Sequence, residues 1–113
     1  MDSLQISSSP HGKIVLITVR GNIDAENAKK FYSKLNEQMS KGFVQVVCNM
    51  EKLEFIASAG IGKMIEVKSK LEKDGGGIKI SCMNDKIKKI FKVMGMINLF
   101  KIYDSDKEAI ESF

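Results

Sequence analysis

Residues 54–64, "EFIASAGIGKM", join a short apolar segment to a run of small residues, among which Ser58 carries the only hydroxyl. No charged residue lies between Glu54 and Lys63. Serine is a preferred first residue at a helix N-terminus, because its side chain accepts a hydrogen bond from a free backbone N–H. Its small neighbours also leave the hydroxyl accessible. The stretch therefore predicts a helix that starts at Ser58 and leaves two roles open for the hydroxyl, a helix cap or a site of chemical modification.

Apolar residues on both sides of this stretch predict a strand followed by a helix. The segment "FVQVVCNM", residues 43–50, is apolar almost throughout, as is typical of a strand buried on both faces. After Ser58 the glycines of "DGGG", residues 74–77, provide the end of the helix. Its predicted buried face consists of Ile61, Met64, Ile65, Val67 or Lys68, and Leu71.

The same alternation of strand and helix fills the rest of the chain. The segments "IVLITV" (14–19) and "IKISC" (78–82) predict buried strands, and the shorter "LQIS" (4–7) and "FKIY" (100–103) predict edge strands. Asp24 is predicted to cap one further helix, and Asn84 or Asp85 to begin another. The residues expected to face inward from the helix after Asp24 are Ala28, Phe31, Tyr32, Leu35 and Met39. In the helix that begins at Asn84 or Asp85 they are Ile87, Ile90, Phe91 and Met94, and Gly95 is expected to end that helix. A short last helix is expected to bury Ala109, Ile110 and Phe113.

Strands that alternate with helices at this spacing predict an α/β fold with a mixed, mostly parallel five-stranded sheet and about four helices. With 113 residues, 43% of them hydrophobic, residues 1–113 are expected to form a single domain, because either half would be too small for its own core. Asp24, Ser58 and Asn84 each begin a helix that follows a strand. All three are therefore expected at one edge of the sheet, where open α/β sheets bind ligands.

Several classes of site are not supported by the sequence. His11 is the only histidine and Cys48 and Cys82 are isolated, so we predict no metal site, disulfide or cofactor. Ala57 and Met64 stand where a phosphate-binding P-loop requires glycine and serine or threonine. No general base accompanies Ser58, and we predict no catalytic residue: the protein is expected to bind a partner and not to act as an enzyme.

The segment at residues 1–13 lacks the pattern of a signal peptide, and the longest apolar run, residues 14–19, is far below the roughly 20 residues of a membrane helix. These features predict a cytoplasmic protein without a membrane partner. A net charge of +4 favours an acidic partner surface but is too small to indicate direct binding of nucleic acid. The lysines of "DKIKKIFK", residues 85–92, are interpreted as the solvated face of a helix.

Three segments together resemble the STAS domain of the anti-sigma factor antagonist family. They are "VRGNIDAENAKKF" (19–31), "VVCNMEKLEFIASAGIGKMIEVKSKL" (46–71) and "IKISCMNDKIKKIFKVMGMINLFKIYDS" (78–105). Their order and spacing carry the resemblance, which covers nearly the whole chain. It implies a mixed sheet with helices mainly on one side and no catalytic activity.

The resemblance also implies a regulated partner. Members of the family bind an anti-sigma factor that is also a serine kinase and thereby free a sigma factor. Phosphorylation of one serine breaks this binding, and a metal-dependent serine phosphatase restores it. Ser58 corresponds to that serine and Asp24 to the acidic residue of the first motif. The residues expected to bind the partner are Asp24, Ala57, Ser58, Ala59, Gly60, Ile61, Gly62 and Lys63.

The sequence departs from the family pattern on both sides of the serine. Ala57 replaces an aspartate, and Lys63 occupies a position that is usually small or apolar. Two hypotheses follow. Ser58 is a phosphorylation switch read by a differently charged partner, or the chain is a STAS adapter subunit of a transport or signalling complex that uses the same edge without a phosphate.

Overall fold

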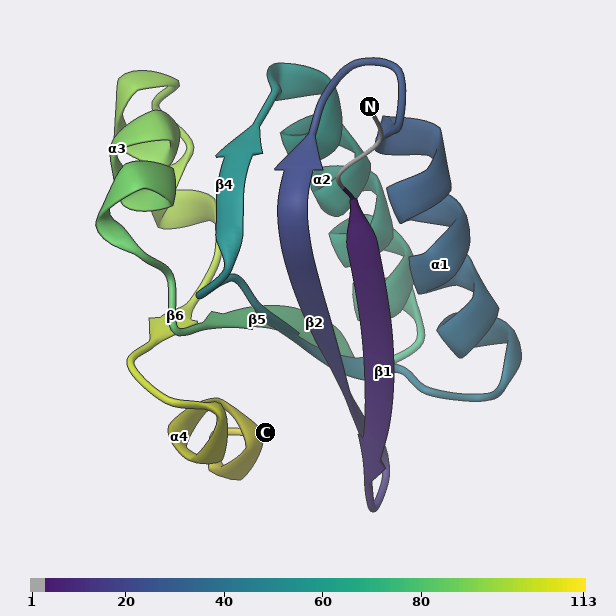
Figure 1. The fold of residues 1–113 in the computed structure, drawn as a ribbon. Helices are drawn as coiled ribbons and strands as arrows, with labels where there is room; N and C mark the ends of the chain where they lie inside the picture. The colour runs from purple at the N-terminus through teal and green to yellow at the C-terminus, as the bar shows by residue number, and fades with distance from the viewer. Residues whose placement is uncertain (1–3) are drawn as a thin grey trace.

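The computed structural model describes residues 4–113, in which one sheet is covered by four α-helices and a short 3₁₀ helix (Figure 1). The strands are β1 (Gln5–His11), β2 (Ile14–Ile23), β3 (Gln45–Asn49), β4 (Leu53–Ile56), β5 (Gly77–Ser81) and β6 (Ile102–Tyr103). The helices are α1 (Ala28–Ser40), α2 (Ser58–Lys73), α3 (Asp85–Val93), the 3₁₀ helix η1 (Ile97–Leu99) and α4 (Asp106–Glu111).

The sheet is mixed and mostly parallel. Its order is β1-β2-β3-β5-β6, and β4 pairs separately with β2. Among the strands of residues 4–113, only β1 runs antiparallel to its neighbour. This architecture confirms the predicted fold class and the four helices, but the sheet has six strands instead of five. The strand that the sequence did not reveal is β4, because it has only four residues and the charged Glu54 interrupts its apolar pattern.

The length of β2 determines where the loops after the strands lie. Its first part, residues 14–18, pairs with β3, whereas residues 21–23 pair with β4 after a change of register between Gly21 and Asn22. The end of β2 therefore extends past β3, together with β4. The loops that follow β2 and β4 are neighbours at one end of the molecule (Figure 1).

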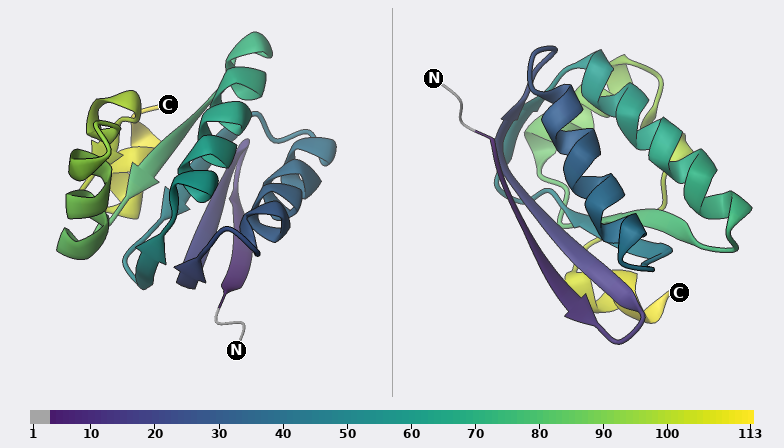
Figure 2. Two further views of the ribbon diagram at one scale, coloured as in Figure 1. Left: turned by 90° about the horizontal axis from the view of Figure 1, so that it is seen from above. Right: turned by 90° about the vertical axis from the view of Figure 1, so that its right-hand side faces the viewer.

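The main core lies between the sheet and the helices α1 and α2, which run side by side on one face (Figure 2). Val15, Ile17 and Val19 alternate inward along β2, as expected for one face of a strand. On the helices the buried residues are Phe31 and Leu35 of α1 and Ile61, Met64, Val67 and Leu71 of α2. Helix α4 packs against β3 and β5, where Asp106 Oδ1 accepts hydrogen bonds from Ser81 Oγ at 2.6 Å and Asn49 Nδ2 at 2.9 Å.

Some helix boundaries differ from the predictions. Helix α1 begins at Ala28 with Asn27 at the cap position, while the Asp24 side chain accepts hydrogen bonds from the N–H groups of Glu26 and Asn27 in the preceding turn. Asn84 does cap α3, since its Oδ1 accepts from the N–H of Ile87 at 2.9 Å. Met94 was expected to face inward but is 37% exposed. Phe113 lies beyond the end of α4.

Within residues 4–113, no helix combines the length and apolar character needed to cross a membrane.

Candidate functional site

The ends of β2 and β4 bring two predicted site segments together. Ile23 pairs with Ile56, and the carbonyl of Ile23 accepts a hydrogen bond from the N–H of Ala57 at 2.8 Å. Asp24, which follows Ile23, and Ser58, which follows Ala57, are therefore neighbours, with Asp24 in the turn after β2 and Ser58 at the first position of α2. The predicted proximity of these two residues follows from this pairing.

Asn84 follows the carboxyl end of β5, as predicted, but it lies apart from Asp24 and Ser58, because β2 and β4 extend beyond β3 and β5. Its Nδ2 donates to the carbonyls of Met50 at 3.2 Å, Glu51 at 3.0 Å and Leu53 at 2.7 Å. These carbonyls lie at the start of β4, whereas Ser58 follows its end. Four strand residues at about 3.3 Å each separate the two positions by roughly 13 Å. Asn84 holds the turn between β3 and β4.

Ser58 is the first residue of α2, and its hydroxyl forms no hydrogen bond with the described residues. The cap position belongs to Ala57, whose extended backbone (φ −80°, ψ 162°) precedes the helix without a side-chain cap. The prediction that Ser58 caps the helix is therefore wrong. The carbonyl of Ala57 accepts from the N–H groups of Gly60 at 2.9 Å and Ile61 at 3.2 Å. The N–H groups of Ser58 and Ala59 have no intrahelical acceptor and lie beside an exposed, unengaged hydroxyl.

The two glycines of α2 differ in what surrounds them. A Cβ on Gly60 would lie 2.6 Å from Ile23 Cγ2 and 3.0 Å from Ile56 Cγ1, so the absence of a side chain lets α2 pack closely on β2 and β4. A Cβ on Gly62 would meet no atom within 4 Å. Gly62 is exposed, and nothing inside the fold requires a glycine there. Gly60 thus allows α2 to pack closely on the sheet, and Gly62 leaves the helix backbone uncovered on the outer surface.

Substitution of these glycines by alanine is expected to change stability in opposite directions. Gly60→Ala should destabilise the fold by about 1–2 kcal/mol, because overpacking against the rigid Ile23 side chain exceeds the gain in helix propensity. Gly62→Ala should stabilise it by up to about 1 kcal/mol, since only the propensity changes. Urea unfolding of both variants measures the difference. Equal midpoints would contradict the close approach at Gly60.

Lys63 lies on the side of α2 that faces α1. Its Nζ is 4.8 Å from the centre of the Tyr32 ring and 3.5 Å from Glu66 Oε1, and its side chain is 35% exposed. Lys70 contacts the same tyrosine, as a hydrogen-bond donor to its hydroxyl and above its ring. A hydrogen bond from Tyr32, followed by the two lysines, lowers the pKa of Glu66. Five residues of helix place Lys63 about 140° around the axis from Ser58, so the two side chains leave α2 in different directions.

Phe55 is a feature of this edge that sequence reasoning missed. It lies in β4, three residues before Ser58, and is 43% exposed. Its neighbour Ile56 packs against Gly60 of α2, so Phe55 faces the other side of β4 and leaves an aromatic ring on the surface there. The signal in the sequence was Phe55 next to Ile56, because two adjacent residues of a strand face opposite sides and cannot both enter one core.

Other reactive groups offer no alternative centre among residues 4–113. No group of three or more histidine, cysteine or acidic residues there could hold a metal ion. Burial raises the pKa of the Cys48 thiol to about 12, and burial followed by the charge of Asp106 raises that of Cys82. Neither thiol is activated as a nucleophile, because the thiolate is the reactive form.

Comparison with known proteins places the chain in a family. Residues 5–109 match the model of the STAS domain. Over 109 residues the chain is 19% identical to the anti-sigma F factor antagonist of Paenibacillus polymyxa, covering 96% of this chain and 93% of that protein.

Solved structures share the fold. The crystal structure of an anti-sigma factor antagonist from Mycobacterium paratuberculosis matches with a TM-score of 0.85 and 18% identity, over 97% of this chain and 93% of that one. The structure of the anti-sigma factor antagonist SpoIIAA in its unphosphorylated form matches with a TM-score of 0.81 and 19% identity, over 96% of this chain and 95% of that one. The structure of Bacillus SpoIIAA in its phosphorylated form matches with a TM-score of 0.71 and 21% identity, over 97% of this chain and 98% of that one. The match to the family model extends over nearly all of the described residues, and the chain therefore belongs to the STAS domain family.

Proposed function

We propose that this protein is an anti-sigma factor antagonist: it binds an anti-sigma factor through the Ser58 edge and so releases a sigma factor. The kinase activity of that partner phosphorylates Ser58 and ends the binding, and a metal-dependent serine phosphatase reverses the modification. The observation that carries the proposal is the exposed hydroxyl of Ser58, which has no hydrogen bond to the described residues although it stands at a helix start. The family membership and the name of the Paenibacillus relative support it.

The start of α2 suits a phosphorylated serine. The N–H groups of Ser58 and Ala59 lack intrahelical acceptors, and the positive end of the helix dipole favours an anion there. With Ala57 at the cap position, the residue directly before the serine carries no carboxylate. Adding about −1.5 to −2 charges would therefore leave α2 folded while changing the character of its outer surface.

The surface around Ser58 suits close contact with a partner. Ala59 and Gly62 are exposed, small and uncharged, and Phe55 is exposed in β4, three residues before Ser58. The open space above Gly62 lets another backbone approach the helix, a typical use of glycine. We assign partner contacts to Asp24 and to residues 57–63, with Gly60 and Ile61 acting mainly by holding the helix start in place.

The second candidate is an adapter that uses this edge without phosphorylation. Ala57 favours it, since the aspartate that precedes the serine in the family is missing. Both candidates describe a binding module without catalytic activity, and they differ only in the fate of Ser58.

Mass spectrometry of the protein captured from its native cells separates the two candidates. We expect a kinase to co-purify, and incubation of the complex with ATP to place one phosphate on Ser58 and release the kinase. Ser58→Ala should abolish the incorporation, whereas Ser69→Ala, a matched change at an exposed serine further along α2, should not. Absence of phosphate from Ser58 in an active kinase complex would leave the adapter as the function.

A further inference from the structure

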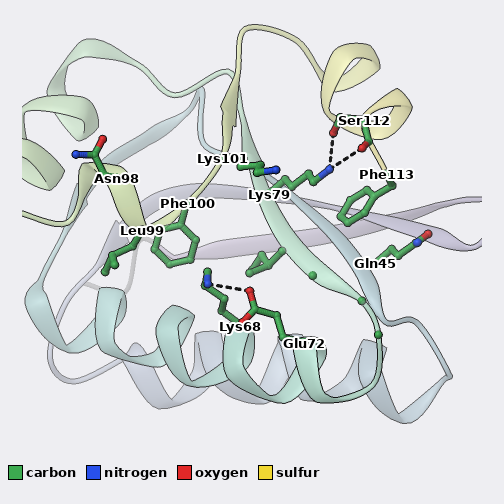
Figure 3. Close-up of a pocket in the computed structure, with 14 residues that line it drawn as sticks. Gln45, Lys68, Glu72, Lys79, Asn98, Leu99, Phe100, Lys101, Ser112 and Phe113 are labelled. Carbon is green, nitrogen blue, oxygen red and sulfur yellow. Dashed lines mark hydrogen bonds and ion pairs between the residues drawn. The ribbon is translucent and has the colours of Figure 1, made fainter.

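A groove with a volume of about 520 Å³ lies at the opposite end of α2 from Ser58 (Figure 3). Helix α2 forms one side with Lys68 and Glu72, and the end of the chain forms the other with Ser112 and Phe113. The segment at residues 98–101 closes one end. The volume falls within the range of about 300–1,000 Å³ that is usual for ligand sites.

The floor of this groove is an unpaired strand edge. Strand β6 has only two residues and pairs with Ile80 and Ser81, so no described strand lies beside residues 77–79 of β5 on that side. The N–H of Gly77 bonds to Val44 on the β3 side, whereas that of Ile80 bonds to Lys101 on the β6 side. Because backbone groups alternate along a strand, the N–H and carbonyl of Ile78 point into the groove. Neither makes a hydrogen bond with the described residues.

The charge around the edge is positive. Lys68, Lys79 and Lys101 line the groove, and the only acidic side chain among its lining residues is Glu72, which pairs with Lys68 at 2.8 Å. Lys79 donates to the carbonyl and hydroxyl of Ser112 and lies 4.1 Å from the centre of the Phe113 ring. Lys101 is exposed and forms no ion pair with the described residues.

Apolar side chains complete the lining. Leu99 is 42% exposed, and Phe100 and Phe113 border the same space. An edge that offers one donor and one acceptor, with apolar area on both sides and lysines at the rim, has the features that recognise an extended peptide by strand addition.

We propose that this groove binds an extended acidic segment of a partner protein. The segment forms an additional strand beside residues 77–79 of β5, in line with β6, which pairs with the next residues of β5. Main-chain hydrogen bonds to Ile78 set the register, and carboxylates of the segment meet Lys101 and Lys79. The site is separate from the Ser58 edge. Lys68, one of the residues that line the groove, is ten residues along α2 from Ser58, which corresponds to about 15 Å at 1.5 Å per residue. The proposal does not depend on the function of Ser58.

Amide hydrogen exchange, followed by NMR, tests the proposal with a defined probe. The probe is a capped heptapeptide of alternating glutamate and valine, and its counterpart has glutamine in place of each glutamate. In the free protein the Ile78 amide should exchange at least about tenfold faster than those of Lys79 and Ile80. The glutamate peptide should slow the exchange at Ile78, and the glutamine peptide should bind more weakly.

Charge variants locate the site. Lys101→Glu should weaken binding of the glutamate peptide about fivefold or more. Lys107→Glu, the same change at an exposed lysine of α4 outside the groove, should have little effect. Ser58→Asp should leave peptide binding unchanged, so this test stands apart from that of the proposed function.

Four results would overturn the proposal. An equal loss of peptide affinity in the Lys101→Glu and Lys107→Glu variants would mean that the peptide binds through general electrostatic attraction. An unchanged exchange rate of the Ile78 amide at saturating peptide would exclude strand addition. Concentration-dependent protection of Ile78 without peptide, with dimers in sedimentation, would make a second copy of the chain the occupant. Inorganic phosphate that shifts the groove resonances as strongly as the peptide would make the groove a small-anion site.

Discussion

Ser58→Asp should bind the anti-sigma factor at least about a hundredfold more weakly than the wild-type protein and melt at nearly the same temperature. A hundredfold corresponds to about 2.7 kcal/mol, which is within the cost of desolvating a carboxylate against an uncharged contact surface. The fold should tolerate the change because Ser58 is exposed and makes no hydrogen bond within the described residues. An aspartate in the first helical turn also interacts favourably with the helix dipole.

Ser58→Ala completes the test, since it separates the hydroxyl's role in the fold from its role in regulation. Removing a capping side chain usually costs about 1 kcal/mol of stability. Because Ala57 holds the cap position, we expect Ser58→Ala to change stability by less than about 0.5 kcal/mol. The variant should bind its partner as the unmodified protein does and lose any response to ATP.

Titration calorimetry with the captured anti-sigma factor, together with thermal melts, measures both quantities. Ser69→Asp is the matched control, because Ser69 is also an exposed serine of α2 but lies three turns from the site. If Ser58→Asp binds as tightly as Ser69→Asp does, the loop is not a charge-sensitive contact and the phosphorylation switch is wrong.

The sequence predicted those strands and helices that are determined by the local pattern of their own residues. The apolar run of β2 and the helical spacing of Phe31, Leu35, Met64 and Leu71 lead to strand and helix whatever lies around them, and each of these helix residues is buried as predicted. The sharp end of α3 at Gly95, where φ is +69°, also follows from the residue alone.

The remaining differences depend on contacts between segments far apart in the chain. Strand β4 exists because β2 shifts register between Gly21 and Asn22 and continues past β3, which no local pattern encodes. Once β4 is present, Asn84 and Ser58 fall at its two ends instead of at one edge. The exact start of α2 is likewise a tertiary result, since Ala57 is held in an extended conformation by its bond to Ile23.

The candidate site was predictable as a set of chain neighbours but not as a surface. Asp24 and residues 57–63 were predicted as partner contacts because their motifs resemble those of the family. The contact of Lys63 with Tyr32 joins two helices, and the exposure of Phe55 depends on β4. Neither contact nor exposure follows from a local sequence pattern.

The glycines at residues 75–77 show the same limit, because the sequence indicates a turn but not which glycine is essential. Gly75, with φ +81°, ends α2 by donating to the carbonyl of Glu72 at 3.1 Å, while Gly76 donates to that of Leu71 at 2.8 Å. These two bonds form a Schellman motif. A Cβ on Gly76 would lie 1.8 Å from the carbonyl oxygen of Val44, whereas one on Gly77 would lie 3.8 Å from Phe113 Cε1, an ordinary contact.

Gly76→Ala should therefore be the most damaging alanine substitution among these glycines. The Val44 carbonyl is backbone and cannot rotate away, so the segment before β3 must separate from the segment before β5. That movement breaks the bond from Gly77 N–H to Val44, 2.9 Å long, with which pairing of the two central strands begins. Overpacking and the lost hydrogen bond together should cost about 2–4 kcal/mol, which corresponds to a fall in melting temperature of roughly 10 °C or more.

Gly77→Ala is the matched control for this change, because it adds the same methyl group one residue further along where space is available. Urea unfolding followed by circular dichroism should give a markedly lower midpoint for Gly76→Ala and a nearly unchanged one for Gly77→Ala. Since neither residue is near Ser58, Gly77→Ala should retain full binding to the anti-sigma factor. Similar midpoints for the two variants would mean that β3 and β5 begin their pairing further from Gly76 than the structure shows, and that the turn acts only as a helix stop.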